Sequence, residues 1–330
     1  MRFLVVGLGS MGKRRVRNLK TLGYDDILVF DMRKDRLVEA ARLGIQTFSS
    51  IDSAIKQKPS AMIISTSPDT HLKYSEISTK NKIPFFTEVN TDPKHISKII
   101  KLTKKSKILA VSSMTMKFHP AIELIKKYIQ KGNLGKPLLL NYHSGENLED
   151  WHPWEKVQDY YVGHISTGGG RDQAVFELEW IFWLFGKPQE VMAKTQKLSK
   201  TKAKIFDTYQ MTFSLSKIPS ANILVDVIQS PPNRILRIIF ENGLIEWSWI
   251  PGIIRIYNST TKKWEEHGHG SGYKGFNVEE MYQKEMTAFV KSLKQNKNLV
   301  HTFEEELLTA KSVISAEISS KQKKTISLKV

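Results

Sequence analysis

The sequence predicts two successive parts: an α/β part built on a doubly wound parallel sheet, then an α+β part with a large, open, mostly antiparallel sheet. In residues 1–119, short apolar runs alternate with helix-compatible stretches, which is the pattern of parallel sheets. From residue 190 onward, short alternating strands dominate, which favours antiparallel pairing. The 330 residues are about twice the roughly 150 expected of one domain. We therefore predict two domains, residues 1–119 and 120–330.

The composition excludes several classes of protein. The chain has no cysteine, which excludes disulfides, thiolate nucleophiles and zinc sites built on sulfur. No apolar stretch approaches the roughly 20 residues that span a bilayer, and the N-terminus reaches a glycine loop too early for a secretory signal. We expect a cytoplasmic protein with no membrane contact. The net charge of +17 invites a nucleic-acid partner, but the lysines are dispersed, which favours a solvated basic surface.

The first element is a strand over residues 2–6, followed by GLGSMG and a helix over residues 13–22. In this arrangement the first glycine allows a tight turn, the second lets the backbone approach a pyrophosphate, and the third lets the helix pack on the strand. The helix N-terminus then offers free N–H groups to phosphates. This predicts a Rossmann domain. Its predicted cofactor contacts are Gly7, Gly9, Ser10, Met11 and Gly12.

The second strand, residues 27–30, ends in Asp31, 19 residues past Gly12. A carboxylate at that place binds the adenosine ribose hydroxyls and repels a 2′-phosphate, so Asp31 favours NAD over NADP. Arg33 and Lys34 follow directly and would form a phosphate clamp if Asp31 turned away. NADP therefore stays open as the alternative.

Three further strands are expected over residues 62–65, 85–88 and 108–112, with helices beginning near Asp69 and at Asp92-Pro93. Pro93 fits the first helical turn, where its missing N–H is not needed. Because ligands bind beyond the carboxyl ends of parallel strands, Ser65 and Glu88 join the predicted cofactor site.

Four segments resemble the Gfo/Idh/MocA oxidoreductase family, named for glucose-fructose oxidoreductase and inositol dehydrogenase. They are GLGSMG, IISTSPDTHLKY, IPFFTEVNTD and MKFHPAIELIKKYIQKGNLGKP. The resemblance implies that Thr66, Pro68 and His71 lie on the nicotinamide side of the cofactor. From the residues alone, the favoured interpretation of His71 is a helix residue whose side chain is bonded to nearby backbone.

The chain departs from the family pattern at two catalytic positions. The usual Glu-Lys-Pro is replaced by Glu88, Val89 and Asn90, and valine cannot move a proton. The resemblance also places a general-base histidine on the helix after GGG, and that position falls at Phe176 here.

Other groups must then move protons. Lys117 stands where many relatives carry arginine, and Glu177 opens the apolar helix, flanked by Asp172 and Glu179. Burial raises a carboxyl pKa and lowers that of an amine, so such groups become usable acids and bases. The structural alternatives are a helix-dipole acid for Glu177 and a surface lysine for Lys117.

Residues 150–163, DWHPWEKVQDYYVG, are dense in aromatic side chains and carry His152 and Glu155. Aromatic faces with interspersed polar groups suit sugars, although an amphipathic helix with tryptophans in a core would show the same pattern. The segment resembles a subgroup of the family whose members build surface-glycan sugars. In that interpretation His152 or Glu155 is the acid/base partner.

In the second domain we expect two closing helices, with a capping box at Thr302 and Glu305, a short last strand at the sheet edge, and a mobile loop over residues 264–276. His267 and His269 in that loop have no local carboxylate cluster, so no metal site is predicted. Apolar and aromatic residues on both faces of the open sheet predict a homodimer or homotetramer through that sheet. The expected strands cover residues 192–196, 208–214, 222–228, 235–240, 244–249 and 253–257.

Two functions follow. The first is an NAD(P)-dependent oxidoreductase that transfers a hydride between nicotinamide and a hydroxyl or carbonyl of a sugar, cyclitol or nucleotide sugar. The second is a catalytically altered family member that binds a dinucleotide and serves as a non-redox binding or assembly partner, which the absent lysine and histidine favour.

Overall fold

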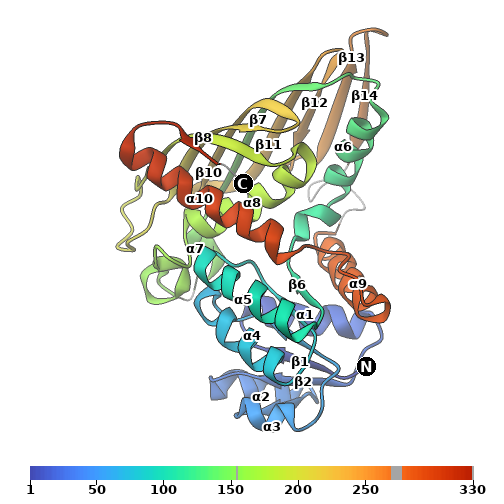
Figure 1. Cartoon of the computed structure of the whole chain (residues 1–330), viewed down its shortest axis with the longest axis vertical. Coiled ribbons are helices and arrows are strands. Elements are labelled where there is room, and N and C mark those ends of the chain that lie inside the picture. Colours follow the sequence, from blue (N-terminus) through green and yellow to red (C-terminus); the bar gives the residue numbers. More distant parts are fainter. Residues whose placement is uncertain (154, 269–276, 329–330) are drawn as a thin grey trace. The chain divides into compact units, whose positions relative to one another are not determined.

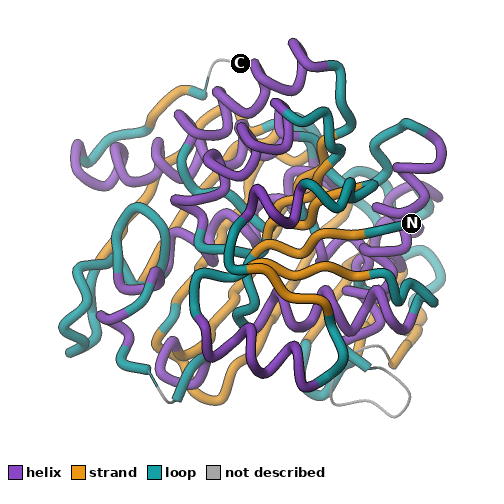
Figure 2. Tube along the Cα trace, turned by 90° about the horizontal axis from the view of Figure 1, so that it is seen from below, coloured by secondary structure: helices purple, strands orange, loops and turns teal. Residues whose placement is uncertain are grey.

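The computed structural model describes residues 1–153, 155–268 and 277–328 (Figures 1 and 2). The chain forms two compact units. Unit 1 comprises Met1–Thr115 and Tyr282–Leu307, and unit 2 comprises Met116–Met281 and Leu308–Val330. The predicted domain boundary at residue 119 stays a prediction. The two units are defined by which residues contact one another, and such contacts do not show which segments fold independently.

Unit 1 is built on a six-stranded, all-parallel sheet with the order β3-β2-β1-β4-β5-β6. Every residue of β1, β2 and β4 is buried, as expected for a sheet covered on both faces. The strand order reverses between β1 and β4, which creates the crevice where such sheets bind ligands. The strands are β1 (Phe3–Val6), β2 (Ile27–Phe30), β3 (Gln46–Phe48), β4 (Ala61–Ile64), β5 (Phe85–Thr87) and β6 (Ala110–Ser112).

The helices between these strands begin near the predicted places. Asp92 caps the helix that starts at Pro93, with its carboxylate accepting from the Lys94 N–H at 2.8 Å. The helix expected near Asp69 starts at His71, after a single 3₁₀ turn. The helices are α1 (Ser10–Thr21), α2 (Lys34–Arg42), α3 (Ile51–Ile55), η1 (Pro68–Thr70), α4 (His71–Lys80) and α5 (Pro93–Ser106).

Unit 2 contains a nine-stranded sheet with the order β14-β13-β12-β11-β7-β10-β9-β8-β15. All neighbours are antiparallel except β7 and β10, so the predicted fold class is confirmed for both parts. The strands are β7 (Pro137–Asn147), β8 (Pro188–Gln196), β9 (Thr208–Leu215), β10 (Ile218–Asp226), β11 (Ile228–Phe240), β12 (Gly243–Ser248), β13 (Ile253–Asn258), β14 (Lys263–Gly268) and β15 (Ile326–Ser327).

Three strands correct the sequence prediction, and the first of them is β3 of unit 1, which was not expected. The central strand β7 was not expected. Strand β14 occupies the first part of the predicted loop 264–276, and its Trp264 ring packs on Tyr257 of β13 at 5.1 Å between centroids. The rest of that loop, including His269, lies outside the described residues.

The two faces of this sheet differ in polarity. Tyr142, Tyr209 and Trp247 are buried on the inner face, where helix α8 (Gly170–Phe185) packs. The outer face carries a polar ladder in which Asn222 bonds to Asn141 at 3.0 Å and to Thr212 at 3.1 Å. The expectation of tryptophan and tyrosine on both faces is therefore wrong for the central strands, because their largest aromatic side chains alternate inward.

The remaining helices end the chain and connect the sheet. In the capping box, the Thr302 N–H donates to Glu305 at 3.0 Å and the Glu305 N–H donates to the Thr302 hydroxyl at 3.2 Å, as predicted. Among the described residues, no helix is both long and apolar enough to cross a membrane. The helices are η2 (Thr115–Phe118), α6 (Pro120–Lys131), α7 (Leu148–Trp151), η3 (Val157–Asp159), η4 (Tyr161–Gly163), α9 (Glu279–Gln295) and α10 (Phe303–Gln322).

Candidate active site

The glycine loop after β1 is packed so closely that two of its glycines have no substitute. Gly7 has φ +92°, and a Cβ there would lie 2.6 Å from the Ser65 carbonyl oxygen. A Cβ on Gly12 would lie 1.8 Å from the Gly7 carbonyl oxygen, so α1 approaches β1 only because this residue is glycine. The loop therefore lies directly against the segment that follows β4.

The start of α1 is free to receive an anion. Its N-cap, Gly9, makes no side-chain capping bond, and the first turn contains no acidic residue. A Cβ on Gly9 would meet only Arg36 within 4 Å, with Nη1 at 3.8 Å. The N–H groups of the first turn, including those of Ser10 and Met11, together with the helix dipole, suit a diphosphate. The cradle fits a dinucleotide.

Asp31 is held in place at the end of β2. Its carboxylate accepts from the Leu8 N–H at 2.6 Å and from the Arg33 N–H at 2.8 Å, and Arg36 lies 3.3 Å away. The side chain of Arg33 pairs with exposed Asp35 at 2.7 Å. Turning Asp31 aside would break two backbone hydrogen bonds, so the phosphate clamp considered for NADP does not form at low cost, and the geometry favours NAD.

The charge of Asp31 is expected to set the preference between the two dinucleotides. Asp31→Asn keeps the size of the side chain but removes the repulsion of a 2′-phosphate, and we expect NADH to bind about tenfold more weakly while NADPH binding improves. Fluorescence titration with both dinucleotides measures the ratio of the NADH and NADPH dissociation constants. Asp35→Asn, at an exposed carboxyl four residues away, is the control. An unchanged ratio in Asp31→Asn would show that Asp31 does not contact the ribose.

Glu88, at the end of β5, anchors this edge of the sheet to α1. It accepts two hydrogen bonds of 2.7 Å from fully buried Arg15 and one of 2.9 Å from Ser65. Arg15 also pairs with buried Glu285 at 2.8 Å and stacks on Phe86. Glu88 thus ties three of the predicted segments together, which makes it a rigid wall of the cradle.

The segment after β4 is held by hydrogen bonds to the residues that follow it. Thr66 bonds to Thr70 at 2.7 Å, and buried Pro68 opens η1. His71 is fully buried, and both of its ring nitrogens lie against protein oxygens, at 3.0 Å from Asn90 and 2.9 Å from Thr66. This burial argues against direct contact of His71 with a cofactor and for a role in holding Thr66.

In unit 2, Glu177 is at the centre of a buried network on α8. Its carboxylate accepts from Tyr142 at 2.6 Å and from Arg234 at 2.8 Å. Further donors are Ser144, Gln173 and Trp180, at 3.1, 3.1 and 3.0 Å. With its oxygens occupied by five donors, Glu177 is suited to holding the core together rather than to moving protons.

Asp172 occupies the first turn of the same helix. It is half-buried, and burial raises its pKa to about 7. One helical turn later, on the same face, lies half-buried Phe176, the position at which the family resemblance expects a histidine. A carboxyl that titrates near neutrality is suited to general acid/base chemistry.

Lys117, in η2, packs on an aromatic ring. Its ammonium lies 5.4 Å from the centroid of Trp183, whose ring also carries Lys126 at 3.7 Å. The pKa of Lys126 is lowered by burial and by nearby Lys217. Trp183 thus holds two cations, which is a means of keeping Lys117 in place.

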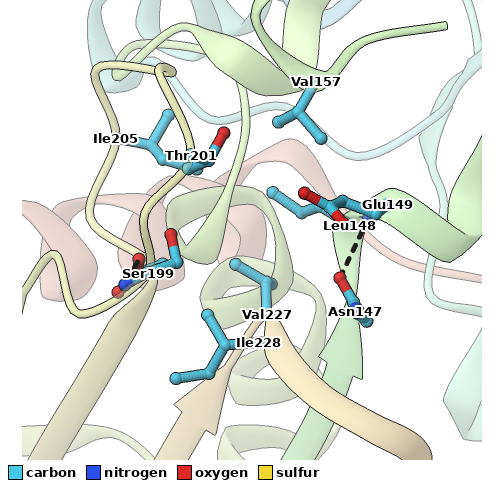
Figure 3. A pocket seen from close by; sticks show the side chains of 10 residues that line it. Asn147, Leu148, Glu149, Val157, Ser199, Thr201, Ile205, Val227 and Ile228 are labelled. Atoms are coloured by element: carbon cyan, nitrogen blue, oxygen red, sulfur yellow. Dashed lines mark hydrogen bonds between the residues drawn. The ribbon is translucent and has the colours of Figure 1, made fainter.

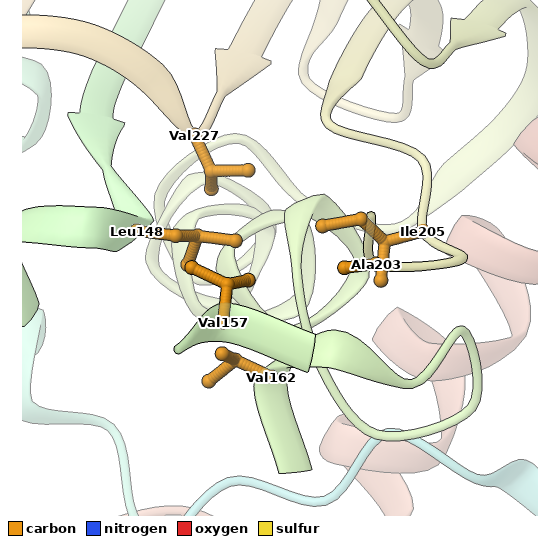
Figure 4. Close-up of a cluster of buried hydrophobic side chains, with 6 residues drawn as sticks. All are labelled: Leu148, Val157, Val162, Ala203, Ile205 and Val227. Carbon is orange, nitrogen blue, oxygen red and sulfur yellow. The ribbon is translucent and has the colours of Figure 1, made fainter. Parts of the chain in front are cut away.

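Residues 148–163 are used partly for packing. Figure 4 shows Leu148, Val157 and Val162 meeting side chains of the loop before β9 and of the turn after β10, and Trp151, Tyr160 and Tyr161 pack on this cluster. Of the predicted alternative, the packing of aromatic rings on a core is seen for these three, but the amphipathic helix is not, because short helical turns occupy the segment instead. Trp154 lies outside the described residues.

His152 and Glu155, the polar pair of this segment, lie close to each other beside these aromatic rings. His152 Nδ1 lies 3.3 Å from the Glu155 carboxylate, and its ring stacks on Tyr160 at 4.9 Å. Burial and the charge of Glu155 raise the pKa of Tyr160 to about 12, so it stays a neutral phenol. The side chains of His152 and Glu155 therefore lie together, and the acid/base role expected of one or the other stays a prediction.

A small cavity lies beside the cluster (Figure 3). It measures about 170 Å³ and combines Leu148, Val157 and Ile205 with the hydroxyls of Ser199 and Thr201. Sites for drug-sized ligands measure roughly 300–1,000 Å³, so this cavity is too small for a nucleotide sugar. In the described part of the chain, no group of three or more His, Asp or Glu side chains is placed to hold a metal ion.

The sequence did not reveal several residues of these networks. Arg15 is one of three arginines on α1, with no local sign that it alone is buried. Arg234 reaches Glu177 across 57 residues, and Asn90 reaches Glu306 across 216. No short pattern carries such pairings.

Comparison with known proteins agrees with both units. Residues 1–113 match the model of an oxidoreductase family with an NAD-binding Rossmann fold, and residues 122–246 match the GFO/IDH/MocA C-terminal domain. NAD is therefore the cofactor of unit 1. The chain is 25% identical over 198 residues to myo-inositol 2-dehydrogenase of Thermotoga maritima, an alignment that covers 58% of this chain and 56% of that protein. It thus spans little more than half the length of that curated relative.

Solved structures share the fold along the whole chain. Levoglucosan dehydrogenase in complex with NADH has a TM-score of 0.89 at 13% identity, covering 100% of this chain and 99% of that one. The WlbA dehydrogenase of Chromobacterium violaceum, in complex with NADH and UDP-GlcNAcA, has a TM-score of 0.81 at 16% identity, covering 100% and 96%. With both of its units matched by family models, the chain belongs to the Gfo/Idh/MocA family of oxidoreductases.

Proposed function

We propose that the chain is an NAD-dependent dehydrogenase or reductase that moves a hydride between nicotinamide C4 and a hydroxyl- or carbonyl-bearing carbon of a sugar, cyclitol or nucleotide sugar. The observation that carries the proposal is the glycine cradle with Asp31 pinned beside it, in a chain of this family. The named relatives act on or bind myo-inositol, levoglucosan and UDP-GlcNAcA, which supports a polyhydroxylated substrate.

Bound NAD supplies the hydride acceptor, so the chain itself must bind, orient and move one proton. Val89 and Phe176 cannot do so. We assign transfer of the substrate hydroxyl proton to Asp172. Its pKa of about 7 lets the carboxylate accept that proton and lets the carboxylic acid return it. The His152–Glu155 pair is the second candidate. Glu177 and Lys117 are assigned to positioning, because the former is bonded to five donors and the latter packs on Trp183.

A polar and aromatic cluster in unit 2 favours a sugar. Glu146, partly exposed, accepts from Arg234 at 2.7 Å and from the Trp151 indole N–H at 3.0 Å. Arg234 in turn lies 4.8 Å from the ring centroid of half-buried Trp249. Aromatic faces beside a carboxylate acceptor match the C–H faces and hydroxyls of a sugar. Membership of the surface-glycan subgroup, and with it a nucleotide-sugar substrate, is part of this proposal.

The test is turnover with NAD against a panel of sugars, inositols and uridine-diphosphate sugars, followed by reduced-nicotinamide absorbance, with NADH and keto sugars in the reverse direction. We expect turnover with at least one polyol class and none without the polyol. Tight NADH binding with no turnover on any compound would instead favour the non-redox partner role.

We also propose that the protein self-associates through the outer face of the nine-stranded sheet, as a homodimer or homotetramer. Met192 is 57% and Ile235 51% exposed on this face, on either side of the Asn141–Asn222 ladder. In a symmetric dimer, this face of one subunit would pack against the same face of a second copy. Light scattering across a range of protein concentrations measures the state, and a monomer at every concentration would exclude this interface.

A further inference from the structure

A chain of hydrogen bonds inside unit 1 joins His71 to Glu306, at the start of α10, through Asn90. His71 Nδ1 lies 3.0 Å from Asn90 Oδ1. The Asn90 amide nitrogen lies 3.1 and 3.0 Å from the two oxygens of Glu306, and the Asn90 backbone N–H donates to Glu306 at 2.8 Å. All three side chains are fully buried, so water does not complete their bonding.

The neighbours of Asn90 fix which way its amide points. The amide nitrogen that faces the Glu306 carboxylate also lies 3.2 Å from the Glu88 carbonyl oxygen. Carbonyl and carboxylate oxygens only accept, so the NH₂ group must face them and the amide oxygen must face His71. Reversing the amide would place its oxygen against three acceptors.

His71 is consequently held between two acceptors. Its Nδ1 faces the Asn90 amide oxygen, and its Nε2 faces the Thr66 carbonyl oxygen at 2.9 Å. A neutral imidazole donates through one nitrogen only, so one contact would set a lone pair against an oxygen. An imidazolium donates through both. At the other end, the donors to Glu306 among the described residues are neutral: Asn90, and the Ser112 hydroxyl at 2.6 Å.

We propose that His71 and Glu306 share one proton across Asn90, and that the imidazolium–carboxylate form fixes the Thr66 carbonyl and so positions the cofactor-facing segment after β4. His71, Asn90 and Glu306 are then positioning residues. Their effect on NAD binding rests on the proposed function, whereas the protonation of His71 does not. The segment matters to the cradle because Ser65 and Thr66 lie in contact with Gly7.

Burial acts against the charged form of both end groups. Burial raises the pKa of Glu306 to about 7, and burial lowers the pKa of His71 from its ordinary value. The bonds from His71 to Thr66 and Asn90, and the charges of Glu88 and Asp69, oppose that lowering. These two shifts alone favour the neutral pair, with the proton on Glu306. The charged form rests on the hydrogen-bond geometry, in which both ring nitrogens of His71 face acceptors and the Glu306 carboxylate faces donors.

Removing the charge of Glu306 tests the proposal. In ¹⁵N NMR of the wild-type protein without cofactor, we expect both His71 ring nitrogens to be protonated, assigned by their loss in His71→Gln. In Glu306→Gln we expect a neutral His71 ring and about tenfold weaker NADH binding. The control is Glu304→Gln, two residues away on the same helix, at an exposed ion pair with Lys104. It should leave both readouts unchanged.

A double variant distinguishes the charge from mere packing. Glu306→Gln with Asn90→Asp exchanges the carboxylate and the amide between the two positions. The carboxylate now at position 90 would accept from His71. The amide now at position 306 would donate to that carboxylate, and its oxygen would still accept from the backbone N–H of residue 90. We expect the protonated His71 ring to return. NADH affinity should return in part, because the second oxygen of the new carboxylate faces the Glu88 carbonyl oxygen, which the Asn90 amide nitrogen contacts at 3.2 Å. A neutral His71 in the wild type overturns the proposal, and so does a double variant that melts like the wild type yet shows no recovery. Absence of hydride transfer in the wild type would sink the proposed function alone.

Discussion

Asp172→Asn is expected to lower turnover by about 10²- to 10⁴-fold while leaving NADH binding unchanged. The substitution keeps the shape of the side chain and removes its only exchangeable acid proton. Because burial raises the pKa of Asp172 to about 7, the base form of the wild type appears as pH rises through 7. Alcohol oxidation should therefore increase across that range and carbonyl reduction should decrease, and both dependences should vanish in Asp172→Asn.

The matched control is Asp159→Asn, at an exposed carboxyl of the same unit. It should retain the wild-type rate and pH profile. Steady-state rates measured from about pH 5.5 to 8.5, together with NADH titration, separate loss of chemistry from loss of binding. A wild-type pH profile in Asp172→Asn would pass the proton-transfer role to the His152–Glu155 pair.

Glu177→Leu should lower the free energy of unfolding by about 3–5 kcal/mol. The fully buried carboxylate holds Arg234, Tyr142, Ser144, Gln173 and Trp180, and its loss leaves a buried guanidinium without one of its two carboxylate partners. Urea denaturation followed by circular dichroism measures the change.

Two comparisons isolate the cause of that loss. Glu266→Leu removes a partner of Arg255 in an exposed pair at 3.5 Å, and such pairs contribute about 0–1 kcal/mol. Combining Glu177→Leu with Arg234→Met should recover part of the loss, because no uncompensated charge remains buried. If Glu177→Leu costs no more than Glu266→Leu, the network is not what stabilises this core.

The sequence was informative where the determining residues are neighbours in the chain. The glycine loop, the helix start at Asp92-Pro93 and the Thr302–Glu305 capping box are local patterns, and the structure has a loop between strand and helix, a helix that begins at Pro93 and the capping box as predicted. Strand β7 was missed because its alternation runs into the polar residues Glu146 and Asn147, where it turns into α7. The cytoplasmic location stays a prediction.

The candidate site was less predictable, because its side chains are set by partners far along the chain. Glu177 is a plausible base until Arg234 is placed beside it, and His71 is a plausible cofactor ligand until Asn90 and Thr66 enclose it. Burial, which separates Asp172 from an ordinary first-turn acid, is a property of the packed chain.

The most direct test of the central claim is the transfer of deuterium from a substrate carbon to the cofactor. The protein is incubated with NAD and with polyols and nucleotide sugars deuterated at their carbinol carbons, and the nicotinamide is analysed by mass spectrometry and NMR. The predicted result is deuterium at C4 of the reduced nicotinamide, from one class of polyol, with about 10²- to 10⁴-fold slower transfer in Asp172→Asn. Bound NAD that acquires no deuterium from any of them would contradict the assignment of this chain as an oxidoreductase of sugars.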